Sequence, residues 1–137
     1  MEEKIVMTEL DALRLKNLII CYSNDRKTDT KNLKYLRKEI GRAEIIKSKQ
    51  IAPDIVTMNS IIEIHNYQSN NDLTIKLVYP TEADYKTGNV SILSPLGSAL
   101  LGYKEGDRVC FDAPGGNVEV HINSITYQPE ANGHYQV

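Results

Sequence analysis

Two aspartates in one polar segment, Asp25 and Asp29, are the residues whose type and spacing could support metal chemistry. Two carboxylates can share a hard cation such as Mg²⁺ through oxygen ligands, and a bound cation can activate water for hydrolysis. Arg26 and Lys27 stand between the two acids and argue against a cation site. The alternative is structural, because aspartates are also favoured as helix caps and in turns. Both hypotheses remain open, and the structural one is favoured.

No other spacing in the chain predicts an enzyme site. His65, His121 and His134 lie in separate segments without a second metal ligand nearby, which favours surface or structural roles. Gly115-Gly116 lacks the following helix that a phosphate-binding loop needs. Ser94 is better explained as a helix cap than as a nucleophile. We therefore expect no catalytic group, no metal and no cofactor.

The two aspartates fall in a bend between two predicted helices. Thr8 followed by Asp11 resembles a capping box, which predicts a first helix over residues 8–22 and a second helix from near Thr30. Residues 1–50 would form an antiparallel, coiled-coil-like hairpin, and the polar segment 47–53 would connect it to a second domain, 51–137. The apolar seams between the helices are predicted to be Leu10, Leu13, Asn17 and Ile20 in the first, and Leu33, Leu36, Ile40 and Ala43 in the second.

Residues 55–137 show the alternation typical of strands. Apolar and polar side chains alternate over residues 62–65, 73–78 and 118–123, and turn-forming residues fill 66–72 and 112–116. Gly88 is predicted to adopt a positive φ in the loop that follows Pro80. The sequence predicts an α+β fold, with an antiparallel sheet of about five strands covered by one short helix.

Residues 89–111 carry the strongest local signal in the chain. A short β-prone run ends at Ser94, an expected N-cap, and Pro95 follows at the first helical position. Leu96, Ala99 and Leu100 form one apolar face, and Gly102 is placed to end the helix in a left-handed conformation. A turn over residues 104–107 leads into the next strand.

Composition is ordinary for a globular protein, with 41% hydrophobic and 25% charged residues. No apolar run approaches the roughly 18 residues of a membrane span, and no signal peptide is visible, so we expect a cytoplasmic protein. Residues 1–50 hold 12 basic and 8 acidic side chains, a net charge of +4, and residues 51–137 hold 4 basic and 10 acidic, a net charge of −6. Residues 1–50, which we call the arm, are therefore basic. The arm could meet a polyanion such as a nucleic acid or an acidic protein surface, or be an ordinary solvated helix face.

Several motifs together resemble the bacterial Gre transcript-cleavage factors. The run SPLGSALLG, followed by EGD and by the turn at residues 114–116, is similar to their C-terminal domain. Residues 56–60, 77–80 and 127–131 (VTMNS, LVYP and YQPEA) are closer to the short-armed branch known as regulators of nucleoside diphosphate kinase. The resemblance covers most of the chain from about residue 54 and implies an FKBP-type fold for this domain.

The resemblance also implies a partner and a docking site. It implies that the chain binds core RNA polymerase at the rim of the secondary channel and competes with other channel-binding factors, without catalysis of its own. In this family the Ser-Pro at the start of the short helix belongs to the docking patch, which here corresponds to Ser94 and Pro95 with Leu93 and Leu96 beside them. Leu93 replaces the acidic residue that cleavage factors often carry there, which favours apolar packing or a shifted footprint.

Two alternatives remain. The chain could stimulate transcript cleavage, with Asp25 and Asp29 helping to hold a polymerase-bound Mg²⁺ as acidic tip residues do in the cleavage factors; the short arm here departs from their long coiled coil. Peptidyl-prolyl isomerase activity is weaker, because it rests on fold analogy alone. The oligomeric state is not predicted.

Overall fold

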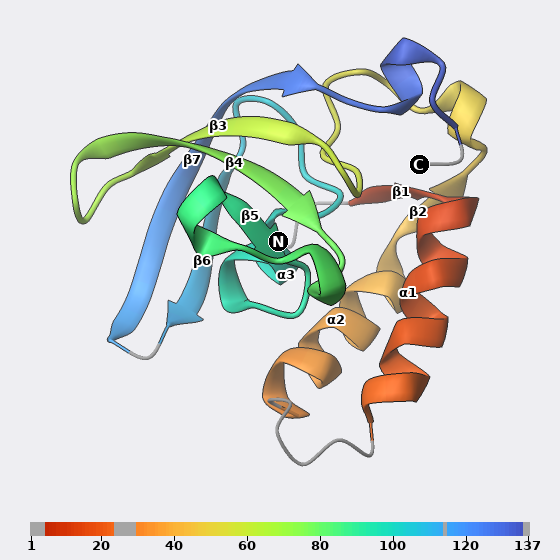
Figure 1. Cartoon of the computed structure of the whole chain (residues 1–137), viewed down its shortest axis with the longest axis horizontal. Coiled ribbons are helices and arrows are strands. Elements are labelled where there is room, and N and C mark those ends of the chain that lie inside the picture. Colours follow the sequence, from red (N-terminus) through yellow and green to blue (C-terminus); the bar gives the residue numbers. More distant parts are fainter. Residues whose placement is uncertain (1–4, 24–29, 114, 136–137) are drawn as a thin grey trace.

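The computed structural model describes residues 5–23, 30–113 and 115–135 and has two helices and a curled sheet as its main parts (Figure 1). None of the helices in these residues is long and apolar enough to cross a membrane. The elements in chain order are β1 (Val6–Thr8), α1 (Glu9–Tyr22), α2 (Thr30–Arg42), β2 (Glu44–Ile46), β3 (Ile61–Asn66), β4 (Asn71–Val78), β5 (Asn89–Ser91), α3 (Pro95–Leu100), β6 (Arg108–Ala113) and β7 (Gly116–Tyr127), with 3-10 turns at Ser48–Gln50, Pro80–Glu82, Tyr85–Thr87 and Glu130–Asn132.

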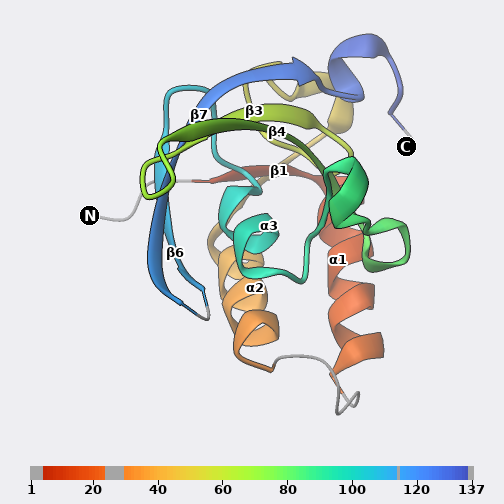
Figure 2. The same ribbon diagram turned by 60° about the vertical axis from the view of Figure 1, so that its left-hand side comes forward.

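The large sheet has the strand order β5-β4-β3-β7-β6. Neighbouring strands are antiparallel except β4 and β5, which pair in parallel through Leu77 opposite Val90. Figure 2 shows the sheet arching over α3, with α1 and α2 side by side below it. The predicted α+β class, with about five strands and one short helix, is confirmed. The sheet was predicted to be antiparallel throughout, and the parallel pairing of β4 with β5 corrects that prediction.

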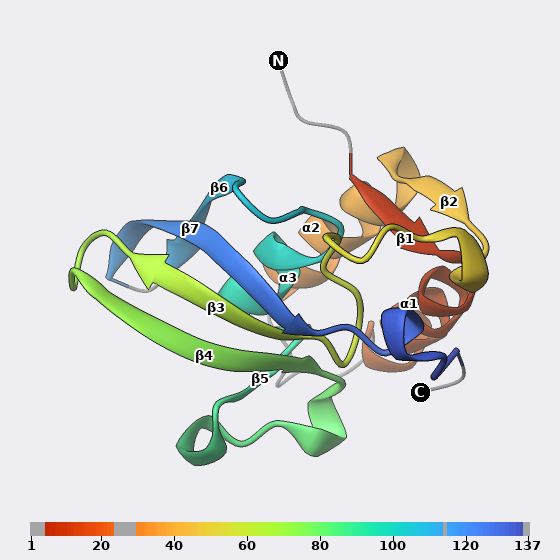
Figure 3. The same cartoon turned by 90° about the horizontal axis from the view of Figure 1, so that it is seen from above.

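A second, two-stranded sheet was not predicted. β1 and β2 pair in parallel at the ends of the helical hairpin, with Met7 opposite Ile45. Figure 3 shows this pair on the α1 side of the molecule, and the Val6 amide donates to the Gly102 carbonyl at 3.2 Å. The strands that flank the helices therefore tie the arm to the segment that follows α3.

Buried side chains from both parts of the chain join one hydrophobic cluster. Leu15 and Leu36 from the helices are fully buried together with Leu77, Leu100 and Ile122 from residues 51–137, which we call the body. Burial of apolar surface is the main favourable term in folding, so the arm and the body stabilise each other. That residues 1–50 and 51–137 form two separate domains remains a prediction.

Our prediction of the seam in α1 is wrong, because another face of this helix is buried. Leu13 and Ile20 are 59% and 68% exposed, and Asn17 is exposed as well. The buried residues of α1 are instead Asp11, Ala12, Leu15 and Ile19. Both sets have helical spacing, and the choice between them depends on contacts of α1 with the body. In α2 the predicted Leu33, Leu36 and Ile40 are buried as expected.

Candidate docking site

The start of α3 is fixed by its cap. The Ser94 hydroxyl accepts a hydrogen bond from the Gly97 amide at 3.1 Å and donates one to the Ser91 carbonyl at 2.7 Å. Pro95 occupies the first helical turn, where its missing N–H removes no helical hydrogen bond. The cap predicted from the sequence is confirmed, and its hydroxyl proton is directed to the Ser91 carbonyl and not toward a base.

A tight contact between α3 and the preceding turn sets the position of Pro95 and Leu96. A Cβ atom on Gly97 would lie 2.1 Å from the Ser91 carbonyl oxygen, so only glycine fits there. Two residues past the helix, Gly102 has a φ of 86°, as its predicted role in ending α3 requires. Gly97 therefore allows α3 to lie close to the turn at Ser91, and Gly102 allows the end of α3 to lie close to Ile5 and Val6.

An open groove of about 380 Å³ lies beside the first turn of α3, and we call it the α3 groove. Tyr85 is 74% exposed and Leu73 is 40% exposed on its walls. Large exposed apolar groups gathered in one place are typical of protein-binding surfaces. The residues that line it are Leu73, Thr74, Ile75, Tyr85, Gly88, Val90, Ser94, Pro95, Leu96, Phe111 and Ala113.

The structure brings three of the four predicted docking residues to this groove. Ser94, Pro95 and Leu96 line it, whereas the Leu93 carbonyl accepts a hydrogen bond from the Asn32 side chain of α2 at 3.1 Å. Leu93 also packs against the core and belongs to the contact between α3 and the arm. Tyr85 was missed in the sequence analysis, although a tyrosine in a polar loop was a usable signal.

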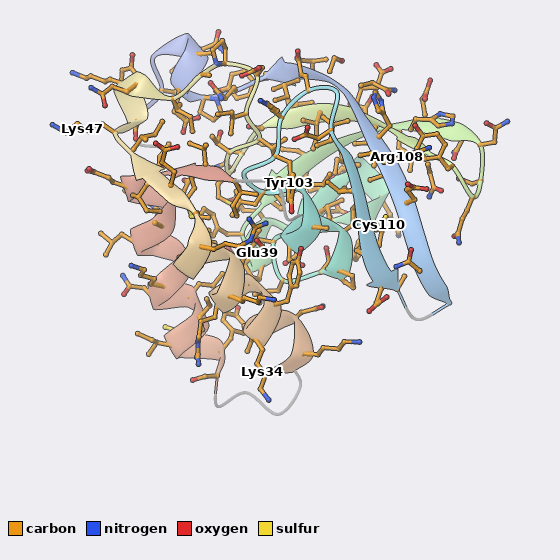
Figure 4. All side chains as sticks on the ribbon, turned by 180° about the vertical axis from the view of Figure 1, so that it is seen from behind. Lys34, Glu39, Lys47, Tyr103, Arg108 and Cys110 are labelled. Carbon is orange, nitrogen blue, oxygen red and sulfur yellow. The ribbon has the colours of Figure 1, made fainter. Side chains whose placement is uncertain are left out.

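On another side of α3, polar side chains join α2 to the segment between α3 and β6. The Arg42 guanidinium contacts the Glu39 carboxylate and donates to the Tyr103 hydroxyl at 3.1 Å. Figure 4 views this side, with Glu39 and Tyr103 near the border of α2 and with Arg108 and Cys110 on β6. Because Arg108 forms an ion pair with Glu119 at 3.0 Å, the positive charges here are balanced. This surface fits a junction between arm and body better than an anion site.

A buried polar junction joins the start of α1 to the body. The Asp11 amide donates to the Thr8 hydroxyl at 3.0 Å, and the Asp11 carboxylate accepts from the Met58 amide at 3.1 Å. Burial raises the pKa of the Asp11 carboxyl to about 7, and the nearby Glu130 carboxylate acts in the same direction. Asp11, predicted as part of a capping box, therefore contacts the body with its side chain.

The motifs at residues 56–60 and 127–131 meet in this junction. The Thr57 hydroxyl donates to the Glu130 carboxylate at 2.7 Å. The Gln128 side-chain amide donates to the carbonyls of Ala52 and Ile55, both at 2.8 Å. These contacts anchor the C-terminal motif to the segment that precedes β3.

The remaining candidates do not form a metal site in the described part of the chain. Asp25 and Asp29 lie outside the described residues. His65 and His121 lie opposite each other on β3 and β7, but each contacts another side chain: His65 contacts Asp72 and His121 contacts Asn123. His134 contacts Tyr127. Among residues 5–23, 30–113 and 115–135, no three His, Cys, Asp or Glu side chains gather where a metal ion could bind.

Comparison with known proteins gives matches over nearly the whole chain. The family model described as "Transcription elongation factor, GreA/GreB, C-term" matches residues 51–127, and the model "Rnk N-terminus" matches residues 3–46. The regulator of nucleoside diphosphate kinase from Escherichia coli (strain K12) is 33% identical over 135 residues, covering 96% of this chain and 95% of the relative.

Transcription elongation factors also match, one of them over part of its length and one over its whole solved chain. Transcription elongation factor GreA from Nitratidesulfovibrio vulgaris (strain DSM 19637 / Miyazaki F) is 32% identical over 96 residues, covering 70% of this chain and 60% of that protein. The solved structure of a prokaryotic transcription elongation factor GreA/GreB from Nitrosomonas europaea is 38% identical, with a TM-score of 0.74, and the match covers 90% of this chain and 100% of that chain.

Proposed function

The chain belongs to the GreA/GreB family of transcription elongation factors, in the branch of the regulators of nucleoside diphosphate kinase, and we propose that it binds core RNA polymerase through the α3 groove. It would dock at the rim of the secondary channel, in the cytoplasm, and compete there with other channel-binding factors. The apolar lining of the groove carries this proposal, because the side chains of Pro95, Leu96 and Tyr85 gather around one open hollow.

The shape of the site supports binding to a preformed protein surface. The cap of Ser94 and the contact of Gly97 fix the first turn of α3, so little conformational entropy is lost when Pro95 and Leu96 are covered. Tyr85 adds a large aromatic ring with a polar end, a residue type that is enriched at interfaces. We expect the ring to be one of the residues that contribute most to the affinity.

The arm would provide the regulatory effect. At 14 residues, α1 is about 21 Å long, and contacts through Asp11 and Arg42 join the hairpin to the body. A body docked at the rim would therefore present the arm in a defined direction, where it would partly occupy the channel entrance. This occupancy would exclude other factors without any chemical step.

Tyr85→Glu/Leu96→Glu should weaken binding to core RNA polymerase at least about tenfold, because it places two charges where apolar contacts are lost. Binding is measured by biolayer interferometry at low salt, with folding checked by circular dichroism. Tyr67→Glu is the matched control, since Tyr67 is 40% exposed on the β3–β4 hairpin and does not line the groove. The proposal fails if the wild type shows no binding at micromolar concentration or if the double variant binds as the wild type does.

Added to backtracked elongation complexes, the wild type should leave the RNA intact and should slow the cleavage that an added GreA factor stimulates. Release of short 3′ fragments by the wild type alone, and its loss in Asp25→Asn, would contradict the non-catalytic role and support the cleavage hypothesis. Gel analysis of end-labelled RNA gives both results.

A further inference from the structure

A second groove lies between α1, α2 and β2, and we call it the arm groove. It has a volume of about 580 Å³ and is open to solvent. Ile19 and Ile40 are buried in it, whereas Ile20 and Ile45 are 68% and 42% exposed. The residues that line it are Lys16, Ile19, Ile20, Arg37, Ile40, Gly41, Ala43 and Ile45.

The exposed side of α1 has a spacing typical of helix-to-helix contacts. Leu13 and Ile20 are seven residues apart on one face and are 59% and 68% exposed. Such a spacing presents apolar side chains along one seam for a partner helix. The chain itself covers the opposite face of α1 and leaves this seam open.

Gly41 gives an independent indication of close approach. Glycine weakens a helix, and here it stands in the last turn of α2 on the wall of the arm groove. A Cβ atom at this position would meet no heavy atom within 4 Å. No packing contact inside the described chain therefore requires a glycine here, and the missing side chain leaves room for the backbone of a partner to approach.

The charges at the edge of the arm groove are positive. Lys16 and Arg37 are exposed on its walls, and Lys34 lies one turn before Arg37 and extends from α2 into solvent in Figure 4. Glu9 and Glu44 are the acidic neighbours, at the start of α1 and beside Ile45. An apolar groove with a basic edge matches an amphipathic helix that carries acidic residues beside its apolar face.

We propose that the arm groove binds an acidic amphipathic helix of a partner protein. The hollow between two helices suits a third helix packed along them, whereas a lipid surface would need a flat or convex apolar face. A second copy of this chain is a poorer occupant, because a two-fold contact uses the same patch on both copies and would place the basic edge of one groove against the basic edge of the other. The arm groove does not include Pro95, Leu96 or Tyr85, so the proposal does not depend on docking at the α3 groove.

The test uses the full chain and a fluorescein-labelled, hydrocarbon-stapled helical peptide with leucine on one face and glutamate beside it. A second peptide with lysine in place of each glutamate tests the charge. Fluorescence anisotropy at low salt should show saturable binding of the acidic peptide only. Gly41→Glu should weaken this binding at least about tenfold, because it places a charged side chain in the groove where the fold leaves room. Gln50→Glu, an exposed change of the same charge outside the groove, should leave the affinity unchanged.

A second variant covers the case in which Gly41→Glu does not fold. Ile20→Gln alters a side chain that is already 68% exposed, so the fold should tolerate it while peptide binding falls. The proposal is overturned if the wild type does not bind the acidic peptide, if it binds both peptides equally, or if both variants bind as the wild type does. It is also overturned if sedimentation shows a dimer that Ile20→Gln dissociates, because the groove would then be filled by a second copy.

Discussion

Gly97→Ala should lower the free energy of unfolding by about 3 kcal/mol or more, a larger effect than most single methyl additions have. The new Cβ atom would lie 2.1 Å from the Ser91 carbonyl oxygen, 2.9 Å from the Ser91 carbonyl carbon and 3.1 Å from the Ile92 Cα. All three atoms belong to the backbone, so no side-chain rotation can relieve the overlap. Urea denaturation followed by circular dichroism measures the change.

Relief of this overlap requires α3 to move away from the turn that precedes it. Ser91 accepts hydrogen bonds from the Ser94 amide and hydroxyl at 3.0 and 2.7 Å, and these bonds would be strained by such a movement. The movement would also shift Pro95 and Leu96 in the α3 groove, so polymerase binding should weaken in the fraction that stays folded. A stability within about 1 kcal/mol of the wild type would contradict this account of the contact.

Gly41→Ala is the matched control for this variant. It makes the same chemical change in a helix, but its Cβ atom meets nothing within 4 Å. Alanine has a higher helix propensity than glycine, so stability should rise by up to about 1 kcal/mol. Opposite signs for the two substitutions would show that the local space, and not the loss of a glycine, decides the outcome.

The features predicted correctly from the sequence are those that neighbouring residues determine. Ser94, Pro95 and Gly102 specify the start and end of α3 within one short segment, and each behaves as predicted. Gly88, in the loop before β5, has the expected positive φ of 83°. Local backbone preferences are sufficient to predict such positions.

The features that were missed depend on residues far apart in the sequence. The exposed side of α1 depends on contacts such as the hydrogen bond from the Met58 amide to the carboxylate of Asp11, 47 residues earlier. The α3 groove brings Leu73, Tyr85 and Phe111 together from three segments. Periodicity shows that a helix has an apolar face but does not choose between two possible faces, because tertiary contacts decide it.

The wild type should lose stability relative to Asp11→Asn as the pH rises from about 4 to about 7. The folded chain holds the Asp11 proton with a pKa of about 7, against an ordinary value of 3.8. Between these values the unfolded chain releases the proton first, so the contribution of Asp11 to stability falls with rising pH and is constant above about 7. At 1.36 kcal/mol for each pKa unit, the whole effect is up to about 4 kcal/mol.

Asp11→Asn should therefore be more stable than the wild type at pH 8, by about 2–4 kcal/mol, with the difference shrinking toward pH 4. The asparagine carbonyl can still accept from the Met58 amide, and its side-chain N–H groups would lie near the Glu130 carboxylate. Urea denaturation across this pH range measures the difference in free energy of unfolding between the two proteins. The other titrating groups contribute equally to both proteins, so their effects cancel in this difference.

Asp11→Ala separates the charge from the hydrogen bond. It removes the carboxylate as Asn does, but it leaves the buried Met58 amide without its acceptor, which costs about 1–3 kcal/mol. This variant should be less stable than Asp11→Asn by a similar amount at every pH, because neither side chain titrates. If Asp11→Asn were instead less stable than the wild type at pH 8, the ionised carboxylate would be stabilising the junction between α1 and the body, and desolvation would not be the dominant effect there.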